Sequence, residues 1–328
     1  DVSGAEVYCT IFSFAESYYT EGMFWVGTDD GLVQLSQDDG VTWRTITPNG
    51  LPEFATISAI ELSRHDHETA YLAAWNYKLD DYSPYIYKTK NSGETWDLIT
   101  KGLPEDDFVR VVREDPVRKN LLYAGTEKGI YLSLNGGESW QPFQGNLPIS
   151  PVHDLMIKDD DLVAATHGRS FWILDDITPL RQIATDLFTA DHHLFKPRST
   201  YRNPEALGKI DQNRIGPGKN YWVATGIPCT FEEYIDVSGV TRRRFLDSGT
   251  DITQGVTIHY YLKSPAEQGL QLSFLNENNG EIASFSNDDP CVERRITNNR
   301  GMNRFVWNMR YKGPIGTTGD SSEDHFQG

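Results

Sequence analysis

The chain has 328 residues, and its 47 Asp and Glu against 30 Lys and Arg give a formal net charge of −17 at pH 7. That charge disfavours nucleic acids and anionic membrane surfaces as partners, because both attract basic patches. No apolar run is long enough to span a membrane, so we expect no membrane insertion. The length predicts one large domain or two medium-sized ones.

The first part of the chain, residues 1–178, consists of short apolar runs separated by turn residues, a pattern typical of an all-β protein. Four successive units repeat the same order of strands. The predicted strands are 8–14, 23–28, 32–35 and 43–47 in the first unit, 57–60, 70–75, 85–88 and 96–99 in the second, 109–112, 121–126, 130–132 and 140–143 in the third, and 152–157, 162–166 and 170–174 in the fourth.

One eight-residue motif occurs in each of the first three units, as SQDDGVTW, TKNSGETW and SLNGGESW. Its Asp or Asn can accept hydrogen bonds from nearby backbone N–H groups, and its Gly tolerates a positive φ, so the motif predicts a tight turn. Its Trp is expected to pack between neighbouring sheets. The residues assigned to the three turns are Ser36, Asp38, Gly40, Thr42 and Trp43, then Thr89, Asn91, Gly93, Thr95 and Trp96, then Ser133, Asn135, Gly137, Ser139 and Trp140.

Four-stranded units of this size predict the blades of a multi-bladed β-propeller. The three tryptophans of the motif are 53 and 44 residues apart, which is the length of one blade. Because the four units differ in sequence and the chain starts in the middle of the repeat pattern, we expect four blades of an incomplete ring. The remaining blades would come from a missing N-terminal region or from another chain.

The second half of the chain changes character. Residues 179–200 are expected to form a linker that includes a short helix at 180–187, and the Gly-, Pro- and charge-rich residues 201–254 an irregular insertion. Alternating apolar runs then predict a β-sandwich over 255–328, without its last strands. Its predicted strands are 256–262, 270–275, 281–286 and 302–311.

The three cysteines, Cys9, Cys229 and Cys291, do not have the spacing of a metal cluster. Cys229 and Cys291 could pair as a disulfide, which would leave Cys9 as a buried thiol. The adjacent His192 and His193 cannot both face one ion from a strand, so we expect no metal site. No Gly-rich phosphate-binding loop occurs, and no cofactor is expected.

The repeated motif resembles the Asp-box of sialidases, sortilin-type receptors and xyloglucanases. Longer stretches, among them VVREDPVRKNLLYAGTEKGIYLSLNGGESWQPF and LPISPVHDLMIKDDDLVAATHGRSFWILDDITPL, resemble the C-terminal part of large exported bacterial proteins with sortilin-like, Asp-box (BNR) repeats. These are often labelled sialidase-like glycosyl hydrolases. The resemblance implies a secreted, periplasmic or cell-surface bacterial location. It covers most of 57–200 and parts of 255–311.

The order of strands in a blade predicts where a site would lie. The turn between the second and third strands should open on the same face as the connections between blades, and the motif turn on the opposite face. In propeller enzymes the active site lies on the first face. Glycosidase chemistry needs two carboxylates there, and the candidates are Asp29, Asp80, Asp81 and Glu127.

The same face carries four candidates for ligand binding. Trp75 and Tyr77 could stack on a sugar, and His167 with Arg169 could bind an anionic group. The alternative for Arg169 is an ion pair with Asp175 or Asp176 that fixes the last blade. The alternative for the carboxylates and aromatic residues is that they are polar turn residues and rim packing.

These observations predict a non-catalytic binding or scaffold module of an exported bacterial protein, which recognises a protein or carbohydrate partner through its propeller face. The alternative is the C-terminal half of a glycoside hydrolase, either sialidase-like or xyloglucanase-like, that uses paired carboxylates. The Arg-Ile-Pro stretch that usually brings the first sialidase arginine is absent from the sequence.

Overall fold

The computed structural model describes residues 8–184, 187–201, 219–224, 227–235, 241–245 and 255–309. The chain divides into two compact units, Asp1–Ile183 and Ala184–Gly328. Each unit is built around its own cores of buried side chains.

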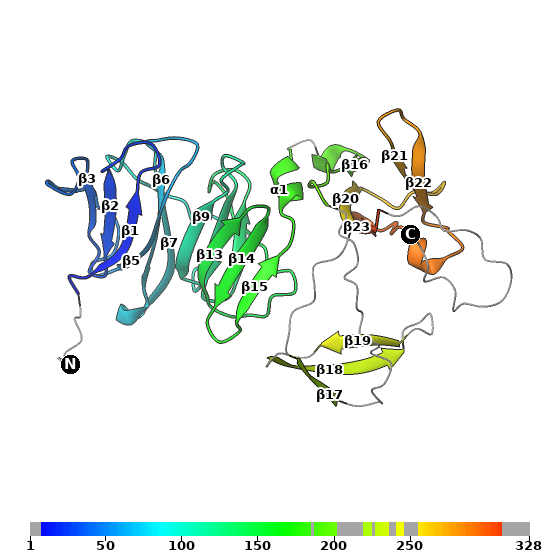
Figure 1. The fold of residues 1–328 in the computed structure, drawn as a ribbon. Coiled ribbons are helices and arrows are strands. Elements are labelled where there is room, and N and C mark those ends of the chain that lie inside the picture. The colour runs from blue at the N-terminus through cyan, green and yellow to red at the C-terminus, as the bar shows by residue number, and fades with distance from the viewer. Residues whose placement is uncertain are drawn as a thin grey trace. The chain divides into compact units, whose positions relative to one another are not determined.

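The first unit is a succession of four antiparallel sheets in chain order, which are the predicted propeller blades (Figure 1). Each strand pairs with the next one along the chain, so every blade is a simple meander. The strands are β1 (Ile11–Glu16), β2 (Phe24–Thr28), β3 (Val33–Ser36) and β4 (Arg44–Thr45) in blade 1, β5 (Thr56–Leu62), β6 (Ala70–Asn76), β7 (Asp81–Thr89) and β8 (Asp97–Leu98) in blade 2, β9 (Val109–Glu114), β10 (Leu122–Thr126), β11 (Ile130–Ser133) and β12 (Gln141–Pro142) in blade 3, and β13 (Val152–Lys158), β14 (Asp161–Thr166) and β15 (Phe171–Leu174) in blade 4.

Blades pack face to face, so the inner blades bury both sides of their strands. All seven residues of β6 are buried: Leu72 packs toward blade 1 and its neighbour Tyr71 toward blade 3. This explains why strands such as β6 and β10 are continuous apolar runs rather than alternating ones. Each large side chain buried in this way contributes about 1.5–3 kcal/mol relative to exposure.

The three motif turns have the same hydrogen bonds, and we call them box turns (residues 36–43, 89–96 and 133–140). In the first, Ser36 Oγ accepts from the Gly40 amide at 2.9 Å, while Asp38 accepts from the Thr42 amide at 2.8 Å and from the Thr42 hydroxyl at 2.6 Å. Asn91 and Asn135 take the place of Asp38 in the other two turns: each accepts from the amide four residues later and donates through Nδ2 to the hydroxyl of that residue. Gly40 has a φ of 81°, as the motif predicted.

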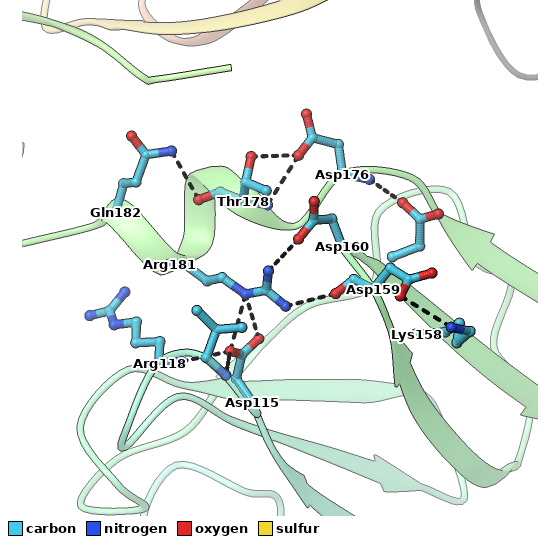
Figure 2. A network of polar contacts seen from close by, with 11 residues as sticks. Asp115, Arg118, Lys158, Asp159, Asp160, Asp176, Thr178, Arg181 and Gln182 are labelled. Atoms are coloured by element: carbon cyan, nitrogen blue, oxygen red, sulfur yellow. Dashed lines mark hydrogen bonds and ion pairs between the residues drawn. The ribbon is translucent and has the colours of Figure 1, made fainter. Parts of the chain in front are cut away.

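A buried ion-pair network closes the first unit (Figure 2). It involves α1 (Thr178–Gln182), a short helix that follows blade 4. Arg181 of α1 donates through Nε to both carboxylate oxygens of Asp115, at 3.0 and 3.1 Å, and through Nη1 to Asp160 at 2.5 Å. Asp115 lies at the end of β9, and its side chain is fully buried. The network therefore ties α1 to both blade 3 and blade 4.

The second unit contains a small β-sandwich. One sheet has the order β16 (His192–Leu194), β20 (Val256–Leu262), β23 (Gly301–Trp307), and the other consists of β21 (Gln271–Leu275) and β22 (Glu281–Ser286). The two sheets share a core in which Phe285 of β22 lies 4.7 Å from Phe305 of β23, between ring centroids.

Three expectations for the second half are corrected by the structure. The region expected to be irregular contains a three-stranded sheet of β17 (Lys219–Ala224), β18 (Ile227–Ile235) and β19 (Thr241–Phe245). Opposite charges face each other across it, as in the ion pair between Arg243 and Glu233 at 3.1 Å, which favours this register. The helix expected at 180–187 is displaced to α1, because Pro179 suits the first turn of a helix.

The third correction concerns the cysteines. Cys291 is free and exposed, so it does not form the disulfide with Cys229 that the sequence left possible, and the side chain of Cys229 lies outside the described residues. Cys9 is also exposed rather than buried. It lies in the turn before β1, where its thiol contacts the Asp30 carboxylate at 3.5 Å.

Candidate functional site

The two ends of the blades carry different kinds of turn, as predicted. The residue after β2 or its equivalent hydrogen-bonds to the segment that enters the blade: the Glu127 amide donates to Phe108 at 3.1 Å, and the His167 amide to Pro151 at 2.9 Å. At the other end, the box turns bond to the turn between the first two strands, as from Asp39 to Gly22 at 3.1 Å. We call the first end the blade-turn face and the second the box face.

Strand pairing identifies the residues of the four blades that occupy equivalent positions near the blade-turn face. Gly27, Ala73, Gly125 and Ala165 pair with corresponding residues of the third strands. Two residues further on, the equivalent positions are occupied by four of the residues that the sequence predicted, Asp29, Trp75, Glu127 and His167.

A β-bulge occurs at the same place in the first strand of all four blades, which is β1, β5, β9 or β13. The register shifts between Ile11 and Ser13, and at the corresponding points of β5, β9 and β13. A bulge adds one residue and re-aims its side chain, and bulges are common beside functional sites. The extra residues are Phe12, Ser58, Arg110 and His153.

Sequence reasoning missed these four bulge residues. A signal for them exists in β9, where Val111 and Val112 are adjacent and both buried after the half-buried Arg110. Such a break in strict alternation marks the extra residue. The same kind of break occurs in β13, where His153 and Asp154 are adjacent exposed polar residues between the buried Val152 and Leu155.

Arg110 and Glu127 form the polar centre of the blade-turn face. Arg110 donates through Nε and Nη2 to the same Glu127 oxygen, at 2.8 and 2.6 Å. The guanidinium carbon also lies 4.9 Å from the Phe108 ring centroid and 5.8 Å from that of Tyr77. The Arg110 side chain is only 16% exposed, so its position is fixed by both the ion pair and the rings.

A row of aromatic rings continues from this centre. The Tyr77 ring lies 4.9 Å from Phe108 on one side and 4.6 Å from Trp75 on the other. Trp75 and Phe108 are buried, whereas Tyr82, 6.3 Å from Phe108, and Phe12, 6.1 Å from Trp75, are about half exposed. The two predicted ligand-binding aromatics are therefore in contact, but Trp75 is buried and Tyr77 has a ring on each side, so the row is open to solvent only at its ends, Tyr82 and Phe12.

Two histidines stack at the other end of the face. The rings of His153 and His167 lie 5.0 Å apart at an interplanar angle of 22°. Burial lowers the pKa of His153, and the positive charges of Arg110 and His167 lower it further. Arg169 is exposed beside them, and its backbone carbonyl accepts the Trp172 indole N–H at 2.9 Å. Asp176, one of the two carboxylates considered as a partner of Arg169, accepts hydrogen bonds from the Thr178 amide and hydroxyl.

Three of the four carboxylate candidates are engaged in local structure, Glu127 through its pair with Arg110. Asp29 is buried and accepts backbone N–H groups of Tyr8 and Thr10, at 3.1 and 2.9 Å. Asp81 accepts the Tyr85 hydroxyl at 2.7 Å and the Ser83 amide at 3.0 Å.

The pKa of Asp81 follows from this setting: burial acts to raise it, but the bonds from Tyr85 and Ser83 outweigh burial and lower it. Asp80 is exposed and has a φ of 63° after the short helix Tyr77–Leu79. These positions suit structural roles for Asp29 and Asp81 better than acid–base chemistry.

Two searches gave negative results within the described ranges. No group of three or more His, Cys, Asp or Glu side chains there is arranged to hold a metal ion. The helices of that part of the chain are all too short or too polar to cross a membrane.

The fold and the site together define an all-β protein of propeller blades, one face of which carries a row of aromatic rings beside the Arg110–Glu127 ion pair. No protein-family model matches the chain, and no curated protein matches it. Among solved structures, it is similar to YCF48 bound to D1 peptide, at 15% identity over 51% of this chain and 51% of that chain, with a TM-score of 0.39.

Two further solved structures are similar over different fractions of this chain. The GH74 xyloglucanase from Xanthomonas campestris matches at 12% identity over 76% of this chain and 42% of that chain, with a TM-score of 0.41. The computationally designed Ika4 protein matches at 12% identity over 54% of this chain and 96% of that chain, with a TM-score of 0.36. The chain spans about half the length of the YCF48 structure and less of the xyloglucanase. Likenesses this weak carry no argument about the site.

Proposed function

We propose that the chain is a non-catalytic binding module that recognises a protein or glycan partner through its blade-turn face. The observation that carries the proposal is the row in which Tyr77 lies between Trp75 and Phe108, with Arg110 over the same rings. The exposed rings at the ends of the row, Tyr82 and Phe12, lie against the buried Phe108 and Trp75 and therefore lose little conformational entropy on binding, which suits them to stack on a sugar or on an apolar side chain.

The polar groups of the face support recognition of a partner with mixed character. His153, His167 and Arg169 are exposed at one end of the face, and Lys78 lies 5.1 Å above the Trp75 ring at the other. These groups are donors that an acidic or hydroxyl-rich partner would accept.

The glycoside hydrolase alternative has less support. Glu127 is paired with Arg110, and Asp29 and Asp81 accept hydrogen bonds from neighbouring backbone and hydroxyl groups. A retaining or inverting pair needs one carboxyl group free to donate a proton and another free to attack or to activate water.

As part of the same proposal, the chain belongs to the exported bacterial, sortilin-like Asp-box repeat proteins. The equivalent hydrogen bonds of the three box turns support this, since Asp38, Asn91 and Asn135 each bond the residue four positions later. An exported location is tested by cell fractionation with an antibody against the chain, and recovery from the cytosol alone would contradict it.

Binding is tested by probing the full chain on a glycan array and on an array of peptides. We expect the unmodified chain to retain a defined subset of probes, and Tyr77→Ala and Arg110→Ala to lose them. The control is Glu94→Gln, because Glu94 is exposed in a box turn on the opposite face. Equal losses in all three variants, or retention of no probe by the unmodified chain, would contradict the proposal.

A further inference from the structure

Neighbouring blades are joined by a contact that occurs twice with the same geometry. The indole N–H of Trp96 in blade 2 donates to the backbone carbonyl of Ile46 in blade 1, at 2.7 Å. The indole of Trp140 in blade 3 donates in the same way to Ile99 in blade 2, at 2.6 Å. In each case the acceptor is three residues after the box tryptophan position of the preceding blade.

The glycine of each box turn is part of the same contact. A Cβ atom at Gly93 would lie 2.6 Å from Ile46 Cδ1, and one at Gly137 would lie 2.3 Å from Ile99 Cδ1. The missing side chain therefore leaves the space that the isoleucine of the preceding blade fills. The Trp and Gly of a box turn form a socket, and in blades 2 and 3 the isoleucine of the preceding blade fills it.

The equivalent socket in blade 1 is empty. A Cβ atom at Gly40 would meet only the ring of Trp43, at 3.6 Å, and that of Phe24, at 4.0 Å. Trp43 is 45% exposed, and its indole N–H turns back to the carbonyl of Gly40 in its own turn, at 3.0 Å. No other blade supplies an acceptor to it in the described part of the chain.

The rest of this face of blade 1 carries exposed apolar residues, whereas the equivalent residues of blades 2 and 3 are buried. Strand pairing makes Ile11 equivalent to Ile57 and Val109. Ile11 is 63% exposed, whereas both equivalents are fully buried. Phe14 is likewise 59% exposed, and its equivalents in the inner blades are buried.

We propose that this face of blade 1, formed by Ile11, Phe14, Gly40 and Trp43, binds a complete four-stranded propeller blade of a partner polypeptide. That blade places an apolar side chain over Gly40 and offers the backbone carbonyl of the same residue to Trp43 Nε1. The two filled sockets in the chain show the required chemistry and geometry directly. The arrangement continues the established interface between blades by one more step.

A second copy of the chain is the less suitable occupant. The exposed end of its blade series is blade 4, whose sheet has three strands, β13, β14 and β15, in the described residues. Blade 4 therefore lacks, in the described residues, the fourth strand after which Ile46 and Ile99 lie in blades 1 and 2.

The first test asks whether the socket is vacant in the unmodified chain. Gly40, Gly93 and Gly137 all have φ between 81° and 93°, so alanine is strained at each of them. Only at Gly93 and Gly137 does the new methyl group also collide with an isoleucine. We expect Gly40→Ala to lower Tm less than Gly93→Ala and Gly137→Ala do. Equal losses would overturn the proposal.

The second test supplies a preceding blade. A copy of residues 11–108, with Trp43→Phe in the copy, is placed directly before Ile11 of the chain, so that the copied Ile99 reaches the socket through its native connection. Hydroxyl-radical footprinting with mass spectrometry then reports on the remaining Trp43. We expect its oxidation to fall several-fold, toward that of Trp140, and to recover when the copied Ile99 is changed to Asp.

Two outcomes would overturn the proposal. One is unchanged oxidation of Trp43 in the extended chain while the Trp96 and Trp140 peptides remain protected. The other is a dimer of the unmodified chain in analytical ultracentrifugation that Trp43→Asp dissociates, because the face would then bind a second copy. If the added blades do not fold, which reactive Trp96 peptides would reveal, the glycine series still tests the vacant socket that the proposal requires, and equal losses there overturn it.

Discussion

The indole of Trp96 donates a hydrogen bond of 2.7 Å to the backbone carbonyl of Ile46, 50 positions earlier in the chain. This bond crosses from one blade to the next, and its equivalent in blade 1 is satisfied locally instead. The same residue type in the same motif thus has two different energetic roles, and the difference can be measured.

Trp96→Phe should destabilise the blades, because an aromatic ring is kept but the indole N–H that bonds the Ile46 carbonyl is lost. A buried acceptor left without a partner costs about 1–3 kcal/mol. Trp43→Phe is the matched control and should cost less than about 0.5 kcal/mol, because Trp43 is half exposed and bonds only to its own turn. Urea unfolding followed by tryptophan fluorescence measures both, and equal losses would contradict the assignment.

Arg181→Ala should be the most damaging single change at the end of the first unit. It leaves the fully buried Asp115 without its cation, and breaking a buried pair on one side typically costs about 3–5 kcal/mol. Lys158→Ala removes an exposed pair with Asp159 and should change stability by less than about 1 kcal/mol. Thermal unfolding compares the two, and a small loss for Arg181→Ala would show that the network of Figure 2 is not maintained in solution.

Glu61 should make the blades less stable as the pH rises from about 4.5 to 7. Burial raises the pKa of this carboxyl group to about 7, although Arg113 lies 3.4 Å away and opposes the shift. Because the folded state holds the proton over this range and the unfolded state releases it, the free energy of unfolding falls with rising pH by a total of about 3 kcal/mol.

The variant Glu61→Gln should remove most of this pH dependence, because its amide cannot ionise. Unfolding free energies of both proteins at several pH values between 4 and 8 measure the slope. A slope that is the same in Glu61→Gln and in the unmodified chain would exclude Glu61 as its source.

The box turn of blade 1 should tolerate Asp38→Asn but not Asp38→Ala, since Asn91 and Asn135 perform the same role in the next two blades. Hydrogen bonds from the Thr42 hydroxyl and amide lower the pKa of Asp38. Its contribution to stability is therefore present above the ordinary pKa of 3.8 and is lost as the pH falls below it. Tm values at pH 7 and pH 3 test this. The prediction is contradicted if Tm falls by the same amount on acidification in Asp38→Asn as in the unmodified chain.

The sequence predicted most of the blades because their signals are local. Turn chemistry such as that of Asp38 and Gly40 acts within eight residues, and the strands between turns follow from runs of apolar residues. Whether a box tryptophan is buried depends on the blade that precedes it, so the exposure of Trp43 was not predictable from the motif.

The candidate site was predictable only in part. The position of Glu127 follows from the order of strands, but its partner Arg110 belongs to a bulge in another strand, 17 residues away. Arg181 and Asp115 are 66 positions apart and were not connected by any pattern. Pairs of this kind depend on how blades pack, which local periodicity does not encode.

The central claim is that the blade-turn face binds a partner without chemical turnover. The most direct measurement incubates the full chain with the glycans it retains on the array and follows them by reducing-sugar release and mass spectrometry. We expect the glycans to be recovered intact and their binding to be lost in Arg110→Ala. Release of products that Asp80→Ala or Glu127→Ala abolishes would contradict the claim.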